Sequence, residues 1–287
     1  MESNVLRLAI QKKGRLADKS LELLKAAGIR IDNYSQQLLV KAQNFDLELL
    51  FIRDDDIPEY VQDGVADIGI VGENVILESG KKLDEIEKLG FGKCRMSLAV
   101  PKHNSFESIK DLEGKSIATS YPKILEDYLN KNDVKANIHF ISGSVEITPN
   151  INMAEAIFDI VSTGSTLISN GLKEVETVLK SEAVLISTKN LSEAKQKMLE
   201  QILFRIRAVN QAKNNKYILL NAPNDSLEEI TRMLPGVKSP TIMPLAIEGW
   251  SSIHTVISED DFWRKIENLK KAGAQGILVL PIEKIIV

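Results

Sequence analysis

The sequence contains few of the residues that define several classes of protein. It has one cysteine, Cys94, and three histidines, at positions 103, 139 and 254. One cysteine excludes an internal disulfide framework and a cysteine-rich zinc site, and isolated histidines form no metal triad. No apolar run approaches the roughly 20 residues that cross a bilayer, and no export signal opens the chain. We therefore expect a cytoplasmic protein in a reducing compartment, with no membrane partner.

An excess of positive charge is also missing. The formal net charge is -4 at pH 7, which argues against a nucleic-acid partner but leaves room for a local basic pocket that binds phosphates. Apolar residues make up 44% of the 287 residues, enough to bury two or three modest cores. The sequence therefore predicts a globular protein with more than one domain.

Strands and helices alternate along most of the chain. Apolar runs predict strands at residues 5–10, 47–52, 66–71, 96–100, 116–118, 138–141, 156–161 and 183–187. Helices are predicted at 16–27, from 57 onward and at 124–129, the second with Pro58 in its first turn and Asp56 as its cap. This alternation indicates an α/β fold with mainly parallel sheets and ligands at the carboxyl ends of strands.

The segment EAIFDIVSTGSTL at 155–167 is the most informative one. A single acid, Asp159, lies in a buried-looking strand, and a loop of small hydroxyl residues around Gly164 follows it. Closely spaced N–H groups and hydroxyls suit a phosphate, and a following helix would add partial positive charge. The alternative is an ordinary strand before a capped helix, because Ser and Thr are common capping residues.

The last third of the chain has a different pattern. A long charged helix is predicted at 191–212. Strands at 216–220, 241–245, 253–257 and 276–280 and helices at 226–234 and 261–272 follow, the first helix with capping-box spacing from Ser226. The order βαββαβ is the ferredoxin-like pattern of many small-molecule regulatory domains, although a plain oligomerisation module fits it equally well.

Several motifs together point to one enzyme family. With SGSVEITP at 142–149 and NGLKEVE at 170–176, the loop resembles, in order and spacing, the long form of ATP phosphoribosyltransferase, the first enzyme of histidine biosynthesis. Further segments are similar to the same family, and the resemblance covers nearly the whole chain: QKKGRL at 11–16, IRDDDIP at 52–58, DIGIVGEN at 67–74, CRMSLA at 94–99, ATSYP at 118–122 and SPTIMPL at 239–245.

The resemblance implies an α/β, bilobal, periplasmic-binding-protein-like catalytic core with a C-terminal ferredoxin-like regulatory domain. Residues 1–93 and 185–213 would form the first lobe with a connector helix, and residues 94–184 the second lobe. Residues 214–287 would bind histidine as a feedback inhibitor. Family members associate as dimers and hexamers, so a homo-oligomer is expected.

The resemblance also assigns the reaction, in which the phosphoribosyl group of phosphoribosyl pyrophosphate is transferred to N1 of ATP. The 5′-phosphate would bind the loop formed by Ser162, Thr163, Gly164, Ser165 and Thr166, and the ribose hydroxyls would meet Asp159 and Glu146. Positioning and charge stabilisation should carry most of the rate. Mg²⁺ would be held mainly by phosphate oxygens, and no metal ligand on the protein is assigned.

The nucleotide site is predicted from arginines that follow strands. Arg15, also a candidate catalytic residue, and Arg53 can each make bidentate phosphate contacts, whereas a lone arginine after a strand is usually a solvated surface group. Gly72, Glu73 and Asn74 either contact ATP or form a tight turn and helix cap. AMP should compete for a site built for ATP. The family likeness places histidine at Thr241 and near Gly276.

Two other functions are possible on the same fold. A binding protein would hold a ligand without chemistry, but no export signal or DNA-binding segment supports a receptor or a transcription factor. A regulatory partner of a separate catalyst should have lost the segment from Asp159 to Thr166, which is intact. The transferase is therefore the favoured hypothesis.

Overall fold

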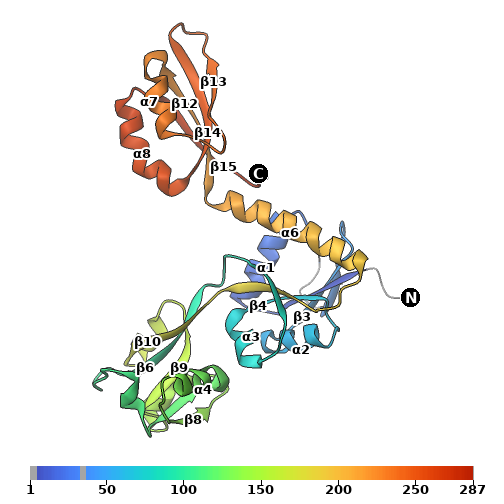
Figure 1. Cartoon of the computed structure of the whole chain (residues 1–287), viewed down its shortest axis with the longest axis vertical. Helices are drawn as coiled ribbons and strands as arrows, with labels where there is room; N and C mark the ends of the chain where they lie inside the picture. The colour runs from blue at the N-terminus through green and yellow to red at the C-terminus, as the bar shows by residue number, and fades with distance from the viewer. Residues whose placement is uncertain (1–4, 33–36, 287) are drawn as a thin grey trace. The chain divides into compact units, whose positions relative to one another are not determined.

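The computed structural model describes residues 5–32 and 37–286 (Figure 1). Residues 1–4, on which the expectation of no export signal partly depends, lie outside this description. No helix in the described ranges is long and apolar enough to span a membrane.

A six-stranded sheet forms the first lobe, with strand order β2-β3-β1-β4-β11-β5. Its central strand β1 pairs in parallel with β3 and β4, whereas β2 and β11 run antiparallel to their neighbours. The strands are β1 (Leu6–Gln11), β2 (Leu39–Lys41), β3 (Leu47–Ile52), β4 (Ile68–Gly72), β5 (Asp84–Lys88) and β11 (Ala183–Ser187); the helices are α1 (Arg15–Ala26), α2 (Ile57–Gln62) and α3 (Glu73–Ser79).

The second lobe is built on a five-stranded sheet with order β10-β6-β9-β7-β8. Here β7 pairs in parallel with β8 and β9, and β6 lies antiparallel between β9 and β10. The elements are β6 (Cys94–Pro101), η2 (Ile109–Leu112), β7 (Ser116–Thr119), α4 (Pro122–Lys131), β8 (Asn137–Phe140), η3 (Val145–Ile151), β9 (Ala156–Val161), α5 (Ser165–Ser169) and β10 (Leu172–Ser181).

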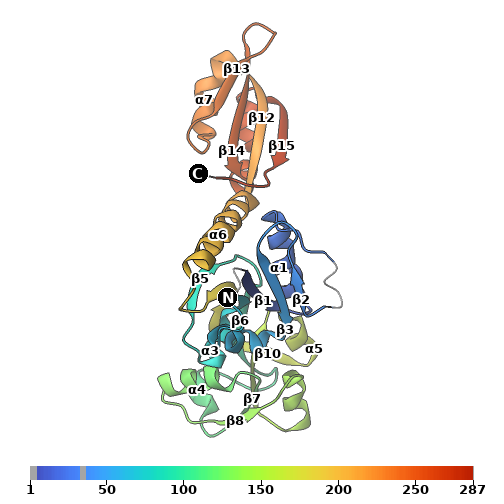
Figure 2. The ribbon, with the colours of Figure 1, turned by 90° about the vertical axis from the view of Figure 1, so that its right-hand side faces the viewer.

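The chain passes between the two lobes twice, as Figures 1 and 2 show. The first passage lies between β5 and β6, and the second lies at Glu182, between β10 and β11. This confirms the predicted bilobal α/β fold. The prediction of mainly parallel sheets is wrong. Only β1–β3, β1–β4, β7–β8 and β7–β9 pair in parallel, and the other pairings are antiparallel, so both sheets are mixed.

Three strands escaped the sequence analysis. The strands β5 and β10 carry several charged residues, and β2 has only three residues, so none of them has a clear apolar pattern. Their pairing with neighbouring strands, more than their own composition, makes them strands.

Two predicted helix caps are wrong for one common reason. Asp56 ends the 3₁₀ turn η1 (Asp54–Asp56) and already has helical φ and ψ angles, and its side chain makes no capping hydrogen bond. Ser226 similarly ends η4 (Asn224–Ser226) and does not cap α7 (Leu227–Met233). A cap requires non-helical angles at the residue before the helix, and the preceding turns remove them. Ser258 does cap α8 (Glu259–Lys271), accepting a hydrogen bond from Asp261 N–H at 3.2 Å.

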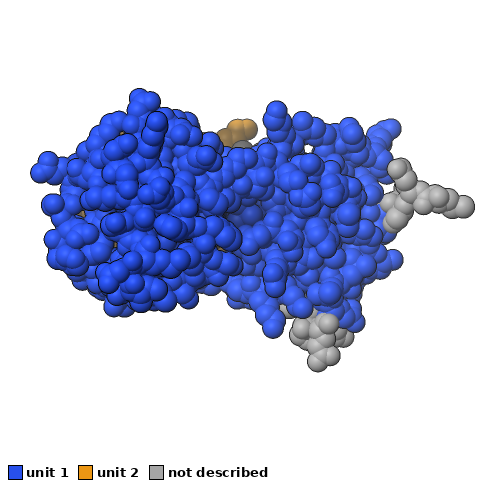
Figure 3. Space-filling model, turned by 90° about the horizontal axis from the view of Figure 1, so that it is seen from below, with its two compact units in different colours: residues 1–201 blue, residues 202–287 orange. Residues whose placement is uncertain are grey.

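The described chain divides into two compact units, residues 1–201 and 202–287 (Figure 3). The first unit contains both lobes. The division falls within α6 (Glu193–Lys213), so one continuous helix belongs to both units.

The second unit has the predicted order βαββαβ. Its antiparallel sheet has the order β13-β14-β12-β15, and a core of strand and helix residues including Ile218, Ile253, Phe262 and Leu269 lies on its helical side. The elements are β12 (Asn215–Pro223), α7 (Leu227–Met233), β13 (Thr241–Pro244), β14 (Trp250–Ser258), α8 (Glu259–Lys271) and β15 (Gln275–Pro281). The ferredoxin-like prediction is confirmed.

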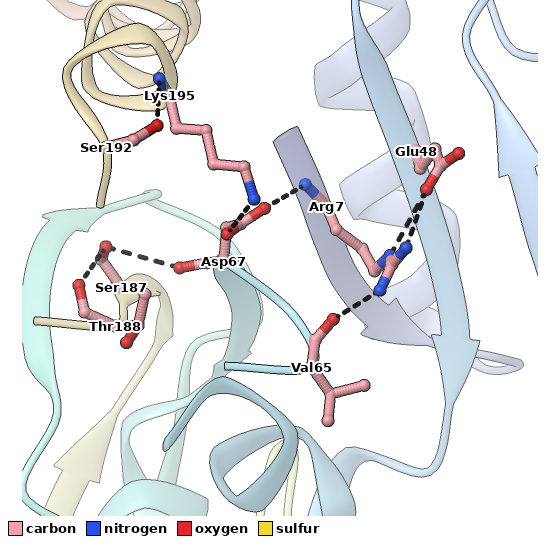
Figure 4. A network of polar contacts seen from close by, with 8 residues as sticks. All are labelled: Arg7, Glu48, Val65, Asp67, Ser187, Thr188, Ser192 and Lys195. Atoms are coloured by element: carbon pink, nitrogen blue, oxygen red, sulfur yellow. Dashed lines mark hydrogen bonds and ion pairs between the residues drawn. The ribbon is translucent and has the colours of Figure 1, made fainter. Parts of the chain in front are cut away.

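A buried carboxylate ties the start of α6 to the first lobe (Figure 4). Asp67 accepts hydrogen bonds from the Arg7 backbone N–H and from Lys195 Nζ, both at 2.8 Å. The Lys195 side chain is 22% exposed and that of Asp67 only 10%. The Arg7 guanidinium continues the network to Glu48 and to the Val65 carbonyl. The helix is thus anchored beside β1 and β4.

Asp67→Asn is expected to lower the free energy of unfolding by about 2 kcal/mol, because Lys195 would keep its charge in a largely buried place without a partner. The urea midpoint, followed by circular dichroism, measures this. Glu193→Gln is the matched control: it breaks an exposed ion pair with Lys197 on the same helix and should cost below about 0.5 kcal/mol. Equal effects of the two changes would contradict the anchoring role.

Candidate functional site

The predicted phosphate loop connects β9 to α5. Gly164 has φ +83°, a left-handed conformation that favours glycine, and precedes the single helical turn of α5. Ser162, Thr163, Ser165 and Thr166 are exposed, while Leu167 is buried beneath them and anchors the loop. The short helix supplies little dipole, so N–H groups and hydroxyls must provide most of the attraction for an anion.

Two carboxylates lie together next to this loop. Asp159 is half-buried on β9, and Glu146 is half-buried on η3. Burial raises the pKa of the Asp159 carboxyl above its ordinary value and the charge of Glu146 raises it further, although a hydrogen bond from Ile160 N–H lowers it. The structure therefore places two predicted site residues near enough for their charges to interact, where carboxylates can accept hydrogen bonds from neighbouring hydroxyls.

Tyr121 belongs to the same site, although the sequence analysis assigned it no role. Its hydroxyl pKa is raised by burial and then by the charges of Asp159, Asp55 and Asp54. The tyrosine of the second lobe thus faces acids of both lobes and remains a neutral hydrogen-bond donor at physiological pH. The ATSYP motif was the available signal, but nothing in it indicated which lobe Tyr121 would face.

A carboxylate of the first lobe binds the second lobe at a point next to Tyr121. Glu78 on α3 accepts hydrogen bonds from the backbone N–H groups of Lys123 and Ile124, each at 3.0 Å. These are unpaired N–H groups in the first turn of α4, where a negative charge is favourable. The contact lies between the two lobes, so it fixes how the carboxyl ends of β4 and β7 approach each other.

The predicted nucleotide arginines follow the carboxyl ends of two neighbouring strands of the first sheet. Gln11 pairs with Ile52 at the ends of β1 and β3, so Arg15 and Arg53 follow adjacent strand ends. Both side chains are exposed, and neither guanidinium makes a hydrogen bond or ion pair with another described residue. They are available for an anionic ligand.

The predicted ATP-binding residues at the end of β4, Gly72 to Asn74, already make contacts within the protein. Asn74 is 3% exposed. Its backbone N–H donates a hydrogen bond to the Ser181 hydroxyl at 3.1 Å, and that hydroxyl donates to Asn74 Oδ1 at 2.9 Å. A Cβ on Gly72 would come within 2.5 Å of Asn74 Oδ1, so a larger residue here would displace the Asn74 amide from Ser181. The Asn74 side chain supports the passage between lobes, and a direct contact with nucleotide remains a prediction.

A cavity of about 470 Å³ lies along the two passages between lobes. It is lined by Glu73, Lys88, Lys93, Cys94, Arg95, Ser162, Lys180, Ser181 and Glu182. Glu73 forms an ion pair with Lys88 at 3.4 Å. Burial raises the pKa of the Cys94 thiol, so this residue is protonated at neutral pH and poorly suited to be a nucleophile.

The two predicted histidine contacts lie on opposite edges of the second unit's sheet. Thr241 is on β13 and Gly276 on β15, with β14 and β12 between them. Three strand spacings of about 4.8 Å separate these edges by about 14 Å. One amino-acid ligand cannot contact both residues of the same chain. No group of three or more His, Cys, Asp and Glu suited to a metal ion occurs among the described residues.

Comparisons with known proteins point to one family. A family model described as ATP phosphoribosyltransferase matches residues 53–208, and one described as the HisG C-terminal domain matches residues 212–284. The ATP phosphoribosyltransferase of Cytophaga hutchinsonii is 58% identical over 284 residues and 99% of each chain. That of Phocaeicola vulgatus is 56% identical over 282 residues, 98% of this chain and 100% of the relative.

A solved structure extends the likeness to the fold. A chain of the ATP phosphoribosyl transferase (HisG:HisZ) complex from Thermotoga maritima superposes with a TM-score of 0.61 at 29% identity, covering 70% of this chain and 98% of that one. Between them, the two family models match residues 53–208 and 212–284, most of the chain described above. The chain belongs to the ATP phosphoribosyltransferase family in its long form, and it transfers the phosphoribosyl group of phosphoribosyl pyrophosphate to ATP in the first step of histidine biosynthesis.

Proposed function

We propose that phosphoribosyl pyrophosphate binds along the end of β9, with its 5′-phosphate in the loop Ser162–Thr166 and its ribose hydroxyls on Asp159 and Glu146. The observation that carries this proposal is the pair of half-buried carboxylates beside a loop of exposed hydroxyls and a left-handed glycine. N1 of adenine then forms a bond to the anomeric carbon as the bond from that carbon to pyrophosphate breaks. The carboxylates favour the positive charge that develops on the sugar.

ATP would approach from the first lobe. The free guanidinium groups of Arg15 and Arg53 follow adjacent strand ends and suit its phosphate chain, with Gly72, Glu73 and Asn74 beside them. Mg²⁺ would arrive on the substrate phosphates, which supply the oxygen ligands it prefers and reduce charge repulsion. AMP, which has the same base and ribose, should compete for this site.

We assign catalysis to residues 1–93 and 185–213 with 94–184, and regulation to residues 214–287. Because Thr241 and Gly276 lie on opposite edges of one sheet, a histidine that contacts both must lie between two copies of the chain. Leu278, Val279 and Leu280 on the edge strand β15 are 54, 42 and 42% exposed, which favours association of copies, from dimers to a hexamer. A cytoplasmic location fits a biosynthetic enzyme of this family.

The assay is formation of phosphoribosyl-ATP from ATP, Mg²⁺ and phosphoribosyl pyrophosphate, with pyrophosphatase added to remove the second product. Product formation that histidine suppresses supports both the active site and the regulatory site. Product formation that is insensitive to histidine supports catalysis and contradicts the regulatory assignment.

Thr163→Val tests the loop. We expect KM for phosphoribosyl pyrophosphate to rise about tenfold, because one hydrogen bond to a charged phosphate is lost, while KM for ATP changes less than about twofold. Initial rates with each substrate varied in turn measure both. Ser169→Ala is the control, since that hydroxyl donates to the Ser165 carbonyl within α5 at 2.7 Å. Equal increases in both KM values, or a large fall in melting temperature, would argue for a purely structural threonine.

A further inference from the structure

Arg95, at the start of β6, connects the phosphate loop to the neighbouring strand β10. Its Nε and Nη2 atoms donate to the two carboxylate oxygens of Glu174 at 2.5 and 2.6 Å. Its remaining nitrogen, Nη1, donates to the backbone carbonyl of Ser162 at 3.1 Å. The guanidinium therefore makes two kinds of contact, a bidentate ion pair with Glu174 and one hydrogen bond to the first residue of the loop.

Glu174 is itself held in place. Glu174 Oε1 accepts hydrogen bonds from the hydroxyls of Ser97, at 2.7 Å, and Thr177, at 3.3 Å. The β10–β6 register shifts between Glu174 and Glu176, an irregularity that re-aims side chains. The hydrogen bond from Arg95 lowers the pKa of the Glu174 carboxyl to about 2, so the ion pair is intact at any pH at which an enzyme would be assayed.

Arg95 contacts the loop close to Gly164, the residue with a left-handed backbone conformation. Ser162 is two residues before Gly164, whose φ of +83° turns the chain into α5. A Cβ built on Gly164 would lie 3.9 Å from Arg95 Nη2, so the guanidinium lies directly against this turn. Since Glu174 neutralises its charge, Arg95 acts on the loop mainly through geometry. The direction of the N–H groups after Ser162 depends on where that carbonyl is held.

We propose that Arg95 is a positioning residue for the phosphoribosyl substrate: held by Glu174, it fixes the Ser162 carbonyl and so orients the loop's N–H groups toward the 5′-phosphate. This rests on the proposed function of the loop. An arginine that only stabilised the fold would affect both substrates alike. A positioning arginine affects the substrate whose phosphate the loop binds.

Arg95→Gln and Glu174→Gln test this in the full-length protein. Both should raise KM for phosphoribosyl pyrophosphate about tenfold to a hundredfold and leave KM for ATP within about twofold. Ribose 5-phosphate, titrated by calorimetry, should lose affinity by a similar factor. Arg232→Gln is the control, because its ion pair with Glu228 is exposed and lies in the second unit. Arg95→Lys, which keeps the charge but cannot make all three contacts, should give an intermediate value.

The outcomes separate the two ideas. If the unaltered protein neither makes product nor binds ribose 5-phosphate, the proposed function of the loop fails. If it does both, and the variants keep its affinity for ribose 5-phosphate or raise both KM values equally, Arg95 does not position the loop. Should Arg95→Gln unfold, Arg95→Lys and Glu174→Gln still decide the question by the same comparison.

Discussion

Asp159→Asn is expected to lower kcat by about a hundredfold or more while leaving the melting temperature unchanged or slightly higher. The substitution preserves the shape of the side chain and removes the negative charge beside the developing positive charge on the sugar. It also removes hydrogen-bond acceptors for the ribose hydroxyls. Steady-state rates and a thermal melt measure the two quantities on the same preparation.

The expected stability follows from the direction of the pKa shift. Burial and Glu146 raise the pKa of Asp159 in the folded state above its ordinary value of 3.8. Between these two pKa values the folded state binds more protons than the unfolded state, so stability falls as pH rises, and above the folded pKa the ionised carboxylate is unfavourable to the fold. A neutral amide removes that cost at neutral pH.

Asp127→Asn on the exposed side of α4 is the control and should leave both rate and melting temperature as they were. If Asp159→Asn loses stability and activity in proportion, Asp159 is a structural residue. A retained rate would show that the charge of this carboxylate is not needed in the transition state.

Complementation between two regulatory variants should restore histidine inhibition. Thr241→Val and Gly276→Ala are each expected to weaken histidine inhibition more than about tenfold, the first by loss of a hydroxyl. In Gly276→Ala, the added methyl group would lie 3.3 Å from Asn221 Nδ2, and residue 276 would have a φ of +58°, which strains any residue other than glycine. If the ligand lies between copies, about a quarter of the sites in an equimolar mixture combine a natural Thr241 with a natural Gly276.

The measurement compares inhibition curves of each variant and of the mixture after subunit exchange, each relative to its own rate without histidine. We expect histidine to inhibit the mixture at the same concentrations as the natural protein, but to suppress a smaller fraction of the rate. A mixture as insensitive as its components would mean that these two residues do not share a site across copies.

The fold could be predicted largely from local pattern. Apolar runs at β1, β3, β4, β9 and β11 and the βαββαβ order of the second unit are visible in the sequence because each strand has the composition of a buried strand. The charged strands β5 and β10 were not visible, since pairing with β11 and β6 determines them. The caps expected at Asp56 and Ser226 failed because short 3₁₀ turns precede both helices.

The candidate site was predictable in its central loop and less so around it. Residues 159–166 stood out because small hydroxyl residues and a glycine follow a buried strand. Tyr121, Glu78 and Arg95 did not stand out, because their partners lie elsewhere in the chain: the Arg95–Glu174 pair is 79 residues apart and the Glu78–Ile124 pair 46 apart. Only sheet register and the approach of the lobes bring such pairs together.

The sequence by itself determined the family, the two kinds of domain and the loop that suits a phosphate, because these depend on neighbouring residues and on motifs in a fixed order. Tertiary structure alone decided which side chains meet. It joined Arg95 to Glu174, turned Asn74 onto Ser181, and placed Thr241 and Gly276 on opposite edges of one sheet. The physical reason is that strand order and register, which set these distances, arise from long-range pairing between segments that carry no mark of their partner.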